Sequence, residues 1–499
     1  MFSLLSKTGE TSGIQGRDTS CSFLQDLNID QILDHITEGW DPECRKMFEA
    51  FPASAEDEEY RRAIYQDVRN EEVYSALTEF YYKILARNTY SEKKEKAYEL
   101  VQKRVWYLRE IFTYVSSITA LNDALLRSSL GSAGLKALSD FLSDTISKED
   151  FRTLNDDVTA LWKELSEFRV ILTYEKDQFT LKCGTTEAQF ENFLSDLFPG
   201  QKNDYGVPFS DEEYFSNLED SIVKLFMKKN KSFFKRLEEF CKKYPTCFNE
   251  DIARIEKEMI YYLAFARFQK MMHTHGYEMC PPKASSGVLS ASGLYDLALA
   301  LTNMETGKKV VPNELYLSDD ESFFVLTGPN QGGKTTYGRS LGQLVYLAKM
   351  GFDVPAASAE VPYFTNLWTH FSVEESLESG RGKLMDELER LKPIMHESQE
   401  RAFVVINELF TTAANYDAIE MGKRVLQYLI DKKCKGIYVT HLGELTRACS
   451  GIISLRAMVD DENKQTFIIE RDEPAELKGI NSQVLKYRLT YEQIKERFS

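Results

Sequence analysis

The chain has 499 residues, more than one hydrophobic core normally organises, so we expect two or three domains. Hydrophobic residues make up 43% of it and charged residues 28%, which is the composition of a globular protein. No apolar run approaches the roughly 18 residues that cross a bilayer, and a net charge of −17 argues against a protein that coats nucleic acid with basic side chains. We therefore expect a cytoplasmic protein without a membrane span.

The first half of the chain, from about residue 30 to residue 272, is dominated by helical periodicity. Apolar residues recur at spacings of four and three along 101–115 and again along 252–266, which predicts long helices that pack against one another. Two short β-like runs within 170–181 flank a polar turn. They predict a small hairpin that interrupts the helices.

The most basic stretch runs from residue 224 to residue 243 and alternates lysines with phenylalanines. One interpretation is a helix with a buried phenylalanine stripe and a solvated basic face. The other is a helix that contacts a nucleic-acid backbone through its lysines. The sequence leaves both open.

A domain boundary is expected where the last long helical pattern reaches Gly276 and the pair Pro281-Pro282. We place the helical domain at 1–277 and a second domain at 278–499. In the second domain short apolar runs alternate with helical patterns, which predicts a largely parallel sheet wrapped by helices. The runs are 323–326, 402–406, 437–439, 452–455 and 467–469.

A glycine-rich motif follows the first of these apolar runs. It fits the phosphate-loop pattern G-x-x-x-x-G-K-[ST] and comprises Gly328, Pro329, Asn330, Gln331, Gly332, Gly333, Lys334 and Thr335. In a strand–loop–helix setting its backbone N–H groups cradle phosphate oxygens. Lys334 then reaches the β- and γ-phosphates and Thr335 ligates Mg²⁺, so the sequence predicts a site for a nucleoside triphosphate.

Hydrolysis also needs a group that anchors the metal and a base near the attacking water. The apolar run before Asn407-Glu408 puts these two residues at the end of a buried strand, where Glu408 can orient or deprotonate water. His441 ends a further strand and is suited to sense the γ-phosphate. Between the two regions, 378–383 reads as a Ser-Gly turn ahead of a helix, which by itself indicates only a helix cap.

Taken together, these blocks resemble the ATPase domain of the MutS family, which belongs to the ABC-type ATPases. The similar segments are 327–337, 351–356, 378–381, 415–418 and 440–441. Residues 24–30 and the helix ending at 276–277 are similar to the family's helical core and levers, and 486–492 to its C-terminal helices.

The resemblance implies a helical core and lever domain followed by a P-loop ATPase domain with C-terminal dimerisation helices. It implies a homodimer that binds ATP and Mg²⁺ and embraces double-stranded or branched DNA, in a short form without the family's mismatch-binding and connector domains. Residues 328–336, including Thr336, would bind nucleotide, Asn407 would face the metal, and Glu408 and His441 would be catalytic. Ser379, Gly380 and Arg381 would close the partner's site.

Two positions depart from the family pattern. Asn407 stands where the family usually has Asp, and Gly382-Lys383 replaces the usual Ser-Thr. Both departures suggest slow turnover. The alternative is therefore a weakly hydrolytic or non-hydrolytic ATP-dependent switch that binds a protein partner in place of DNA.

Overall fold

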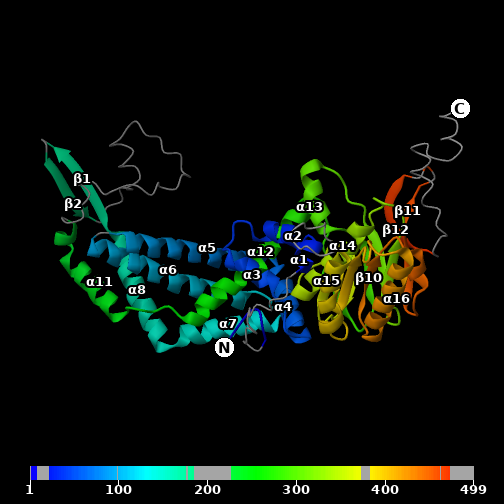
Figure 1. The fold of residues 1–499 in the computed structure, drawn as a ribbon. Coiled ribbons are helices and arrows are strands. Elements are labelled where there is room, and N and C mark those ends of the chain that lie inside the picture. Colours follow the sequence, from blue (N-terminus) through cyan, green and yellow to red (C-terminus); the bar gives the residue numbers. More distant parts are fainter. Residues whose placement is uncertain are drawn as a thin grey trace. The chain divides into compact units, whose positions relative to one another are not determined.

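The computed structural model organises the chain into two compact units (Figure 1). One comprises Met1–Asn70, Gly131–Leu135 and Lys257–Ser499, and the other Glu71–Leu130 and Lys136–Glu256. The structure describes residues 2–7, 22–97, 99–175, 178–184, 226–372, 383–460, 462 and 464–472, with the backbone alone for 169–175, 178–184, 305 and 383. Within these ranges no helix is long and apolar enough to span a membrane.

The unit centred on residues 71–256 is built from long helices, as the apolar periodicity predicts. Its helices are α5 (Glu71–Lys96), α6 (Leu100–Arg127), most of α7 (Ala133–Ser147), α8 (Glu149–Glu167), α11 (Lys231–Lys243) and the start of α12 (Glu250–Thr274). Helix α6 packs along α5 and also contacts α8 and α11. Phe112 of the predicted apolar seam stacks on Trp162 of α8, with ring centroids 5.0 Å apart.

The predicted hairpin is present in the same unit. Strand β1 (Arg169–Glu175) pairs antiparallel with β2 (Gln178–Gly184), and Glu175 lies opposite Gln178.

The basic stretch lies largely in α11, and four of its basic side chains pair with carboxylates. One side of this helix is buried through Phe233, Leu237 and Phe240. The ion pairs are Arg236–Glu164, Lys243–Asp157, Lys242–Glu238 and Lys235–Glu239. A buried apolar stripe opposite a paired, solvated face is an ordinary amphipathic helix, so the structure favours this interpretation over contact with a nucleic-acid backbone.

The other unit contains a six-stranded sheet in the order β12-β11-β6-β10-β9-β8. Its strands are β6 (Phe323–Thr327), β8 (Leu367–Phe371), β9 (Phe403–Asn407), β10 (Lys435–Val439), β11 (Ile452–Val459) and β12 (Gln465–Arg471). All neighbours pair parallel except β11 and β12, which form an antiparallel edge. The five predicted apolar runs are strands of this sheet, and the largely parallel arrangement is confirmed.

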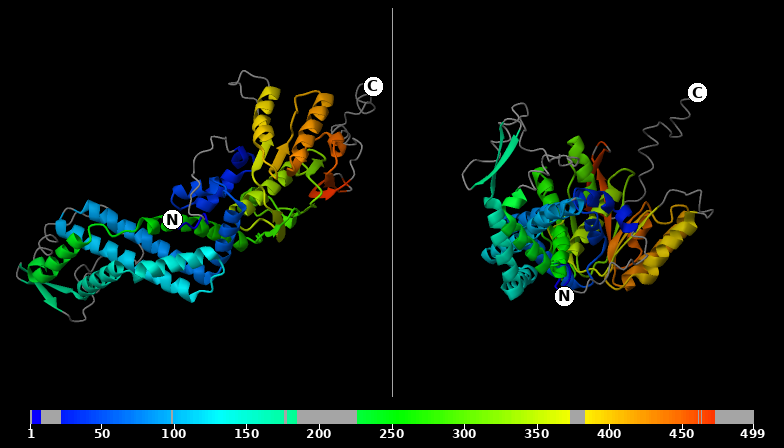
Figure 2. Two further views of the ribbon diagram at one scale, coloured as in Figure 1. Left: turned by 90° about the horizontal axis from the view of Figure 1, so that it is seen from below. Right: turned by 90° about the vertical axis from the view of Figure 1, so that its left-hand side faces the viewer.

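Helices cover both faces of this sheet. On one face α15 (Lys383–Glu397) and α16 (Asn415–Asp431) lie side by side, and they share a buried cluster with strand residues such as Val404 and Tyr438 (Figure 2). On the other face α14 (Lys334–Met350) approaches closely, because a Cβ at Gly338 would lie 3.3 Å from Val439. The central strands β6, β9 and β10 are buried on both faces and are accordingly almost wholly apolar.

A second, four-stranded sheet and several short helices complete this unit. The sheet has the order β3-β7-β4-β5, with β3 (Lys283–Ser285), β4 (Leu289–Leu294), β5 (Asn313–Leu317) and β7 (Ser358–Pro362). The helices are α1 (Ser22–Asp26), α2 (Ile29–Thr37), α3 (Glu43–Glu49), α4 (Ala55–Val68), α13 (Leu297–Thr306) and the 3₁₀ helix η1 (Gly443–Arg447). The sequence did not indicate the four-stranded sheet.

The N-terminal helices pack directly on α14. Arg339 of α14 donates to the carbonyl of Asp26 at 3.0 Å, and Gln343 donates to the carbonyl of Leu27 at 2.9 Å. Leu27 is fully buried, and a Cβ at Gly342 would lie 2.6 Å from its methyl groups. Residues 22–27 are therefore part of the same packed body as the sheet.

The end of α14 is fixed by an aromatic cluster. Gly351 ends the helix at φ 89°, a left-handed conformation that favours glycine. The next residue, Phe352, is fully buried among Phe48, Tyr65, Tyr261 and Phe265, and it stacks on Phe265 with 4.0 Å between ring centroids. The compact units are not the expected domains, since residues 1–70 belong to the same unit as the sheet. The domain boundary expected at residue 277 stays a prediction.

Candidate functional site

The glycine-rich loop connects β6 to α14 at the carboxyl end of the parallel strands. Gly328 has φ 136° and Gly333 has φ 85°, both in the region that glycine tolerates. A Cβ at Gly328 would lie 2.9 Å from the Cβ of Ala457 in β11. The loop therefore needs glycine for its backbone conformation and for its close approach to β11.

Lys334 is the first residue of α14, and its side chain turns into the loop. Its Nζ donates to the carbonyl oxygens of Gly328 and Pro329, each at 2.9 Å. The residue is only 5% exposed. Burial lowers the pKa of Lys334, whereas the nearby Glu408 raises it. The loop thus encloses a cationic side chain together with a helix N-terminus, a combination that attracts an anion.

The tip of the loop is open. Asn330 and Gln331 are exposed, and Gln331 adopts φ 62°. The carbonyl of Asn330 accepts a hydrogen bond from Gln465 of β12 at 3.1 Å. Thr336, the third residue of α14, is half-buried. The β11–β12 hairpin thus supports the loop from one side and leaves its tip accessible.

Thr335 and Asn407 come together as the sequence predicts. Asn407 ends β9 beside Val439 of β10 and Phe371 of β8, so the strand ends lie in one row. Thr335 Oγ1 donates to Asn407 Oδ1 at 3.1 Å. A hydroxyl and an amide oxygen are hard ligands of the kind that Mg²⁺ prefers. Among the described residues no group of three or more His, Cys, Asp or Glu is arranged to hold a metal ion.

Glu408 and His441 also lie side by side. Glu408 has φ 54°, and its N–H donates to the carbonyl of Val439 at 2.9 Å. Its Oε1 lies 2.9 Å from Nε2 of His441, and the two side chains are 33% and 46% exposed. A carboxylate oxygen accepts from an imidazole N–H, so this distance fits a hydrogen bond between the two side chains. The structure therefore presents a solvent-accessible carboxylate next to an imidazole, one residue beyond Asn407.

Not every predicted site residue can be placed. Ser379, Gly380, Arg381 and the departing Gly382 lie outside the described residues, as do the predicted C-terminal helices at 486–492. The backbone of Lys383 begins α15. The part of the site that the resemblance assigns to a partner subunit therefore stays a prediction.

Three residues that contribute to the site were not predicted from the sequence. Ala457 packs against the glycines, Gln465 holds the loop tip, and Glu387 of α15 accepts a hydrogen bond from the turn after Glu408. None of them lies in a local motif. Only the pairing of distant strands and the packing of α15 bring them there, so no pattern of neighbouring residues signals them.

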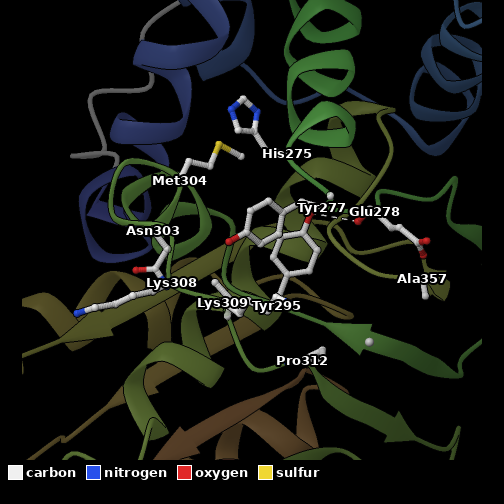
Figure 3. A pocket seen from close by; sticks show the side chains of 14 residues that line it. His275, Tyr277, Glu278, Tyr295, Asn303, Met304, Lys308, Lys309, Pro312 and Ala357 are labelled. Atoms are coloured by element: carbon white, nitrogen blue, oxygen red, sulfur yellow. Dashed lines mark hydrogen bonds between the residues drawn. The ribbon is translucent and has the colours of Figure 1, made fainter.

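A cavity of about 610 Å³ lies elsewhere in the same unit, between the end of α12, β4, α13 and the segment 307–312 (Figure 3). The rings of Tyr277 and Tyr295 lie 5.4 Å apart in it, and the Tyr295 hydroxyl donates to the carbonyl of Glu278 at 3.1 Å. Lys308 and Lys309 are exposed at its edge. Of its lining residues that the structure describes, none is a predicted site residue.

The architecture defines the class of this unit as an α/β domain. A mostly parallel sheet is covered by helices on both faces, and a glycine-rich loop leads from a central strand into a helix at the carboxyl ends of the strands. Comparison with known proteins identifies the type: residues 324–477 match MutS domain V. This part of the chain is therefore similar to MutS domain V.

Curated relatives agree with this assignment. The DNA mismatch repair protein MutS of Solibacter usitatus is 31% identical over 188 residues, which are 37% of this chain and 22% of that protein. MutS of Fervidobacterium nodosum is 30% identical over 152 residues, 30% of this chain and 18% of that protein. MutS 1 of Haloarcula marismortui is 34% identical over 144 residues, 29% and 16% respectively. The matches thus span about a fifth of the relatives' lengths.

Proposed function

We propose that this chain is a MutS-like ATPase that binds ATP with Mg²⁺ and acts in the cytoplasm as an ATP-gated, DNA-binding homodimer in DNA repair or recombination. The observation that carries the proposal is the convergence of Lys334, Thr335, Asn407, Glu408 and His441 around one glycine-rich loop. The match to domain V of mismatch repair proteins supports it.

The loop fits the phosphates of a nucleotide. A Cβ at Gly328 or Gly332 would meet Ala457 at 2.9 Å and 3.2 Å, so only glycine leaves the backbone this close to β11. The N–H groups of 329–335 and the N-terminus of α14 would bind phosphate oxygens. Lys334 Nζ, now bonded to two loop carbonyls, would turn to the β- and γ-phosphates. Asn330 would contact phosphate or position water.

The metal would sit beside Thr335 and Asn407. When bound, Mg²⁺ supplies charge neutralisation on the β- and γ-phosphates, with Thr335 Oγ1 as a ligand and Asn407 Oδ1 accepting from a metal-bound water. The two oxygens lie 3.1 Å apart, which suits one shared ion. The amide at 407 carries no charge, so metal affinity is expected to be weaker than with a carboxylate.

Glu408 would take the proton from the attacking water. Its carboxylate is accessible to solvent and lies next to the strand end that carries Asn407. His441 Nε2, which lies 2.9 Å from Glu408 Oε1, would donate to the carboxylate and orient it. To donate to the γ-phosphate at the same time His441 must use Nδ1, which requires the doubly protonated ring. Ser379, Gly380 and Arg381 of the partner subunit would complete the site.

The first experiment measures ATP hydrolysis with and without DNA. Turnover is recorded with duplex, mismatched and branched DNA, alongside Lys334→Ala, which should lose ATP binding because it removes the cation inside the loop. DNA affinity is measured from low to physiological salt, since contacts to phosphates make affinity fall steeply with salt. Absence of ATP binding by the wild type would refute the ATPase, and absence of DNA binding at low salt would refute the DNA-binding role alone.

A second candidate is a weakly hydrolytic ATP-dependent switch that binds a protein partner. Asn407 in place of a carboxylate and the net charge of −17 favour it. Such a switch would bind ATP tightly, hydrolyse it at a negligible rate at all Mg²⁺ concentrations, and show no affinity for duplex, mismatched or branched DNA. Turnover that rises with Mg²⁺ and with DNA would exclude it.

A further inference from the structure

Glu387 is a buried carboxylate that contacts the turn after Glu408, the proposed base. Glu387 lies on α15 and is 3% exposed. Its Oε2 accepts a hydrogen bond from the backbone N–H of Phe410 at 3.1 Å, and its Oε1 lies 3.4 Å from the hydroxyl of Thr411. A buried carboxylate is costly unless it is hydrogen-bonded. Its position suggests a task at the turn that it contacts.

That turn has an unusual backbone. Glu408 has φ 54° and Phe410 has φ 63°, so two non-glycine residues in left-handed conformations flank Leu409. Such conformations persist only where surrounding contacts impose them. On one side the N–H of Glu408 is held by the carbonyl of Val439 at 2.9 Å. On the other side the N–H of Phe410 is held by Glu387, and this second contact comes from a helix and not from the sheet.

Helix α15 is itself fixed to the end of β8. Arg390, one turn after Glu387, donates to the carbonyl of Phe371 at 2.7 Å and pairs with Asp26 at 3.0 Å. The carbonyl of Glu387 lies 3.2 Å from Nε2 of His370. Helix α15 therefore contacts both the end of β8 and the turn that follows Glu408.

We propose that Glu387 is a positioning residue for ATP hydrolysis. It sets the conformation of the 408–411 turn and so aims the Glu408 carboxylate. This inference rests on the proposed function, because it takes Glu408 as the base.

The test compares Glu387→Gln and Glu387→Ala with the matched control Glu397→Gln, an exposed carboxylate at the end of the same helix. The kcat for ATP hydrolysis, the Kd for ATP and the melting temperature are measured for the full chain. We expect kcat to fall about 10-fold for Glu387→Gln, whose amide oxygen still accepts, and about 100-fold for Glu387→Ala. The Kd should stay within about 3-fold, since the glycine loop is untouched.

Two outcomes would overturn the inference. One is a kcat within 2-fold of the wild type for Glu387→Ala. The other is a loss of ATP affinity in parallel with kcat, which would indicate a purely structural role. If neither Glu387 variant folds, Thr411→Val is decisive, because Thr411 is exposed and its loss removes a donor to Glu387. Thr411→Val should lower kcat about 3-fold at unchanged Kd, and an unchanged kcat would then reject the positioning role.

The same series separates this inference from the proposed function. Glu408→Gln is measured in parallel as the reference for a lost base. If Glu408→Gln hydrolyses ATP like the wild type, the proposed catalytic role of Glu408 fails. If Glu408→Gln is inactive while the Glu387 variants keep full kcat, only the positioning role fails.

Discussion

Replacing Asn407 with aspartate should lower the Mg²⁺ concentration at which ATP hydrolysis is half-maximal. The side chain ends β9, is 8% exposed, and accepts a hydrogen bond from Thr335 at 3.1 Å, which a carboxylate can accept equally well. A single negative charge about 4 Å from a divalent cation gains roughly 2 kcal/mol at the dielectric constant of water and roughly 8 kcal/mol at an effective value of 20. Because the aspartate must also be desolvated, we expect a net gain of about 1–2 kcal/mol.

That gain corresponds to a midpoint in Mg²⁺ concentration about 5- to 30-fold lower. The assay is steady-state ATP hydrolysis at saturating ATP over a range of Mg²⁺ concentrations, for the wild type, Asn407→Asp and Asn88→Asp. The last variant adds the same charge at an exposed position of α5 and should leave the midpoint unchanged. A midpoint for Asn407→Asp within 2-fold of the wild type would show that residue 407 does not face the metal.

The remaining predictions concern the base, the loop and a buried histidine. Glu408→Gln should lower turnover about 100-fold or more with ATP binding retained, and measurable turnover at the wild-type rate would reject Glu408 as the base. Gly328→Val should lower the unfolding free energy by about 2–3 kcal/mol and weaken ATP binding, because φ 136° and Ala457 at 2.9 Å leave no room for a side chain. A calorimetric melting curve and an ATP titration measure the two effects. A variant with wild-type stability and wild-type affinity for ATP would contradict this prediction. Burial, followed by the positive charge of Arg390, lowers the pKa of fully buried His370 to about 4, against an upward effect of the Glu387 carbonyl. His370 therefore binds a proton less readily in the folded protein than in the unfolded chain. Its contribution to the unfolding free energy is complete above about pH 6.5 and is lost as the pH falls towards 4; the decrease between pH 7 and pH 5 should be about 2 kcal/mol. Urea unfolding at both pH values should show this loss in the wild type and a smaller one in His370→Phe, and equal losses would contradict the assignment.

Local patterns predicted the parts of the fold that local sequence controls. The run Phe323–Leu326, the glycines and the helix after them are contiguous, so the strand–loop–helix order could be read directly. Asn407 and Glu408 were placed near Thr335 because parallel strands end at the same edge of a sheet. His441 followed for the same reason, and the structure puts it against Glu408.

The rest depended on contacts between distant segments. Ala457 abuts Gly328 only because β11 pairs with β6, and no property of an alanine in a strand predicts this. Strand β4, with the sequence Leu-Ser-Ala-Ser-Gly-Leu, has little β propensity, and its pairing with β5 and β7 decides its conformation. Glu387 looked like one acidic residue among several on an amphipathic helix. Its function as an acceptor becomes visible only when the turn at Phe410 is in place.

The packing of residues 22–27 on α14 has a practical consequence for how the nucleotide site is isolated. A recombinant fragment that starts at residue 278 would contain all the motifs of the site but would remove Leu27 from Gly342 and the carbonyl partners of Arg339 and Gln343. It would also uncover Phe352, whose aromatic neighbours all precede residue 278. Such a fragment should aggregate or bind nucleotide poorly. Inactivity of the fragment would therefore reflect the position of the cut, and only longer fragments that keep the N-terminal helices can measure the intrinsic activity of the site.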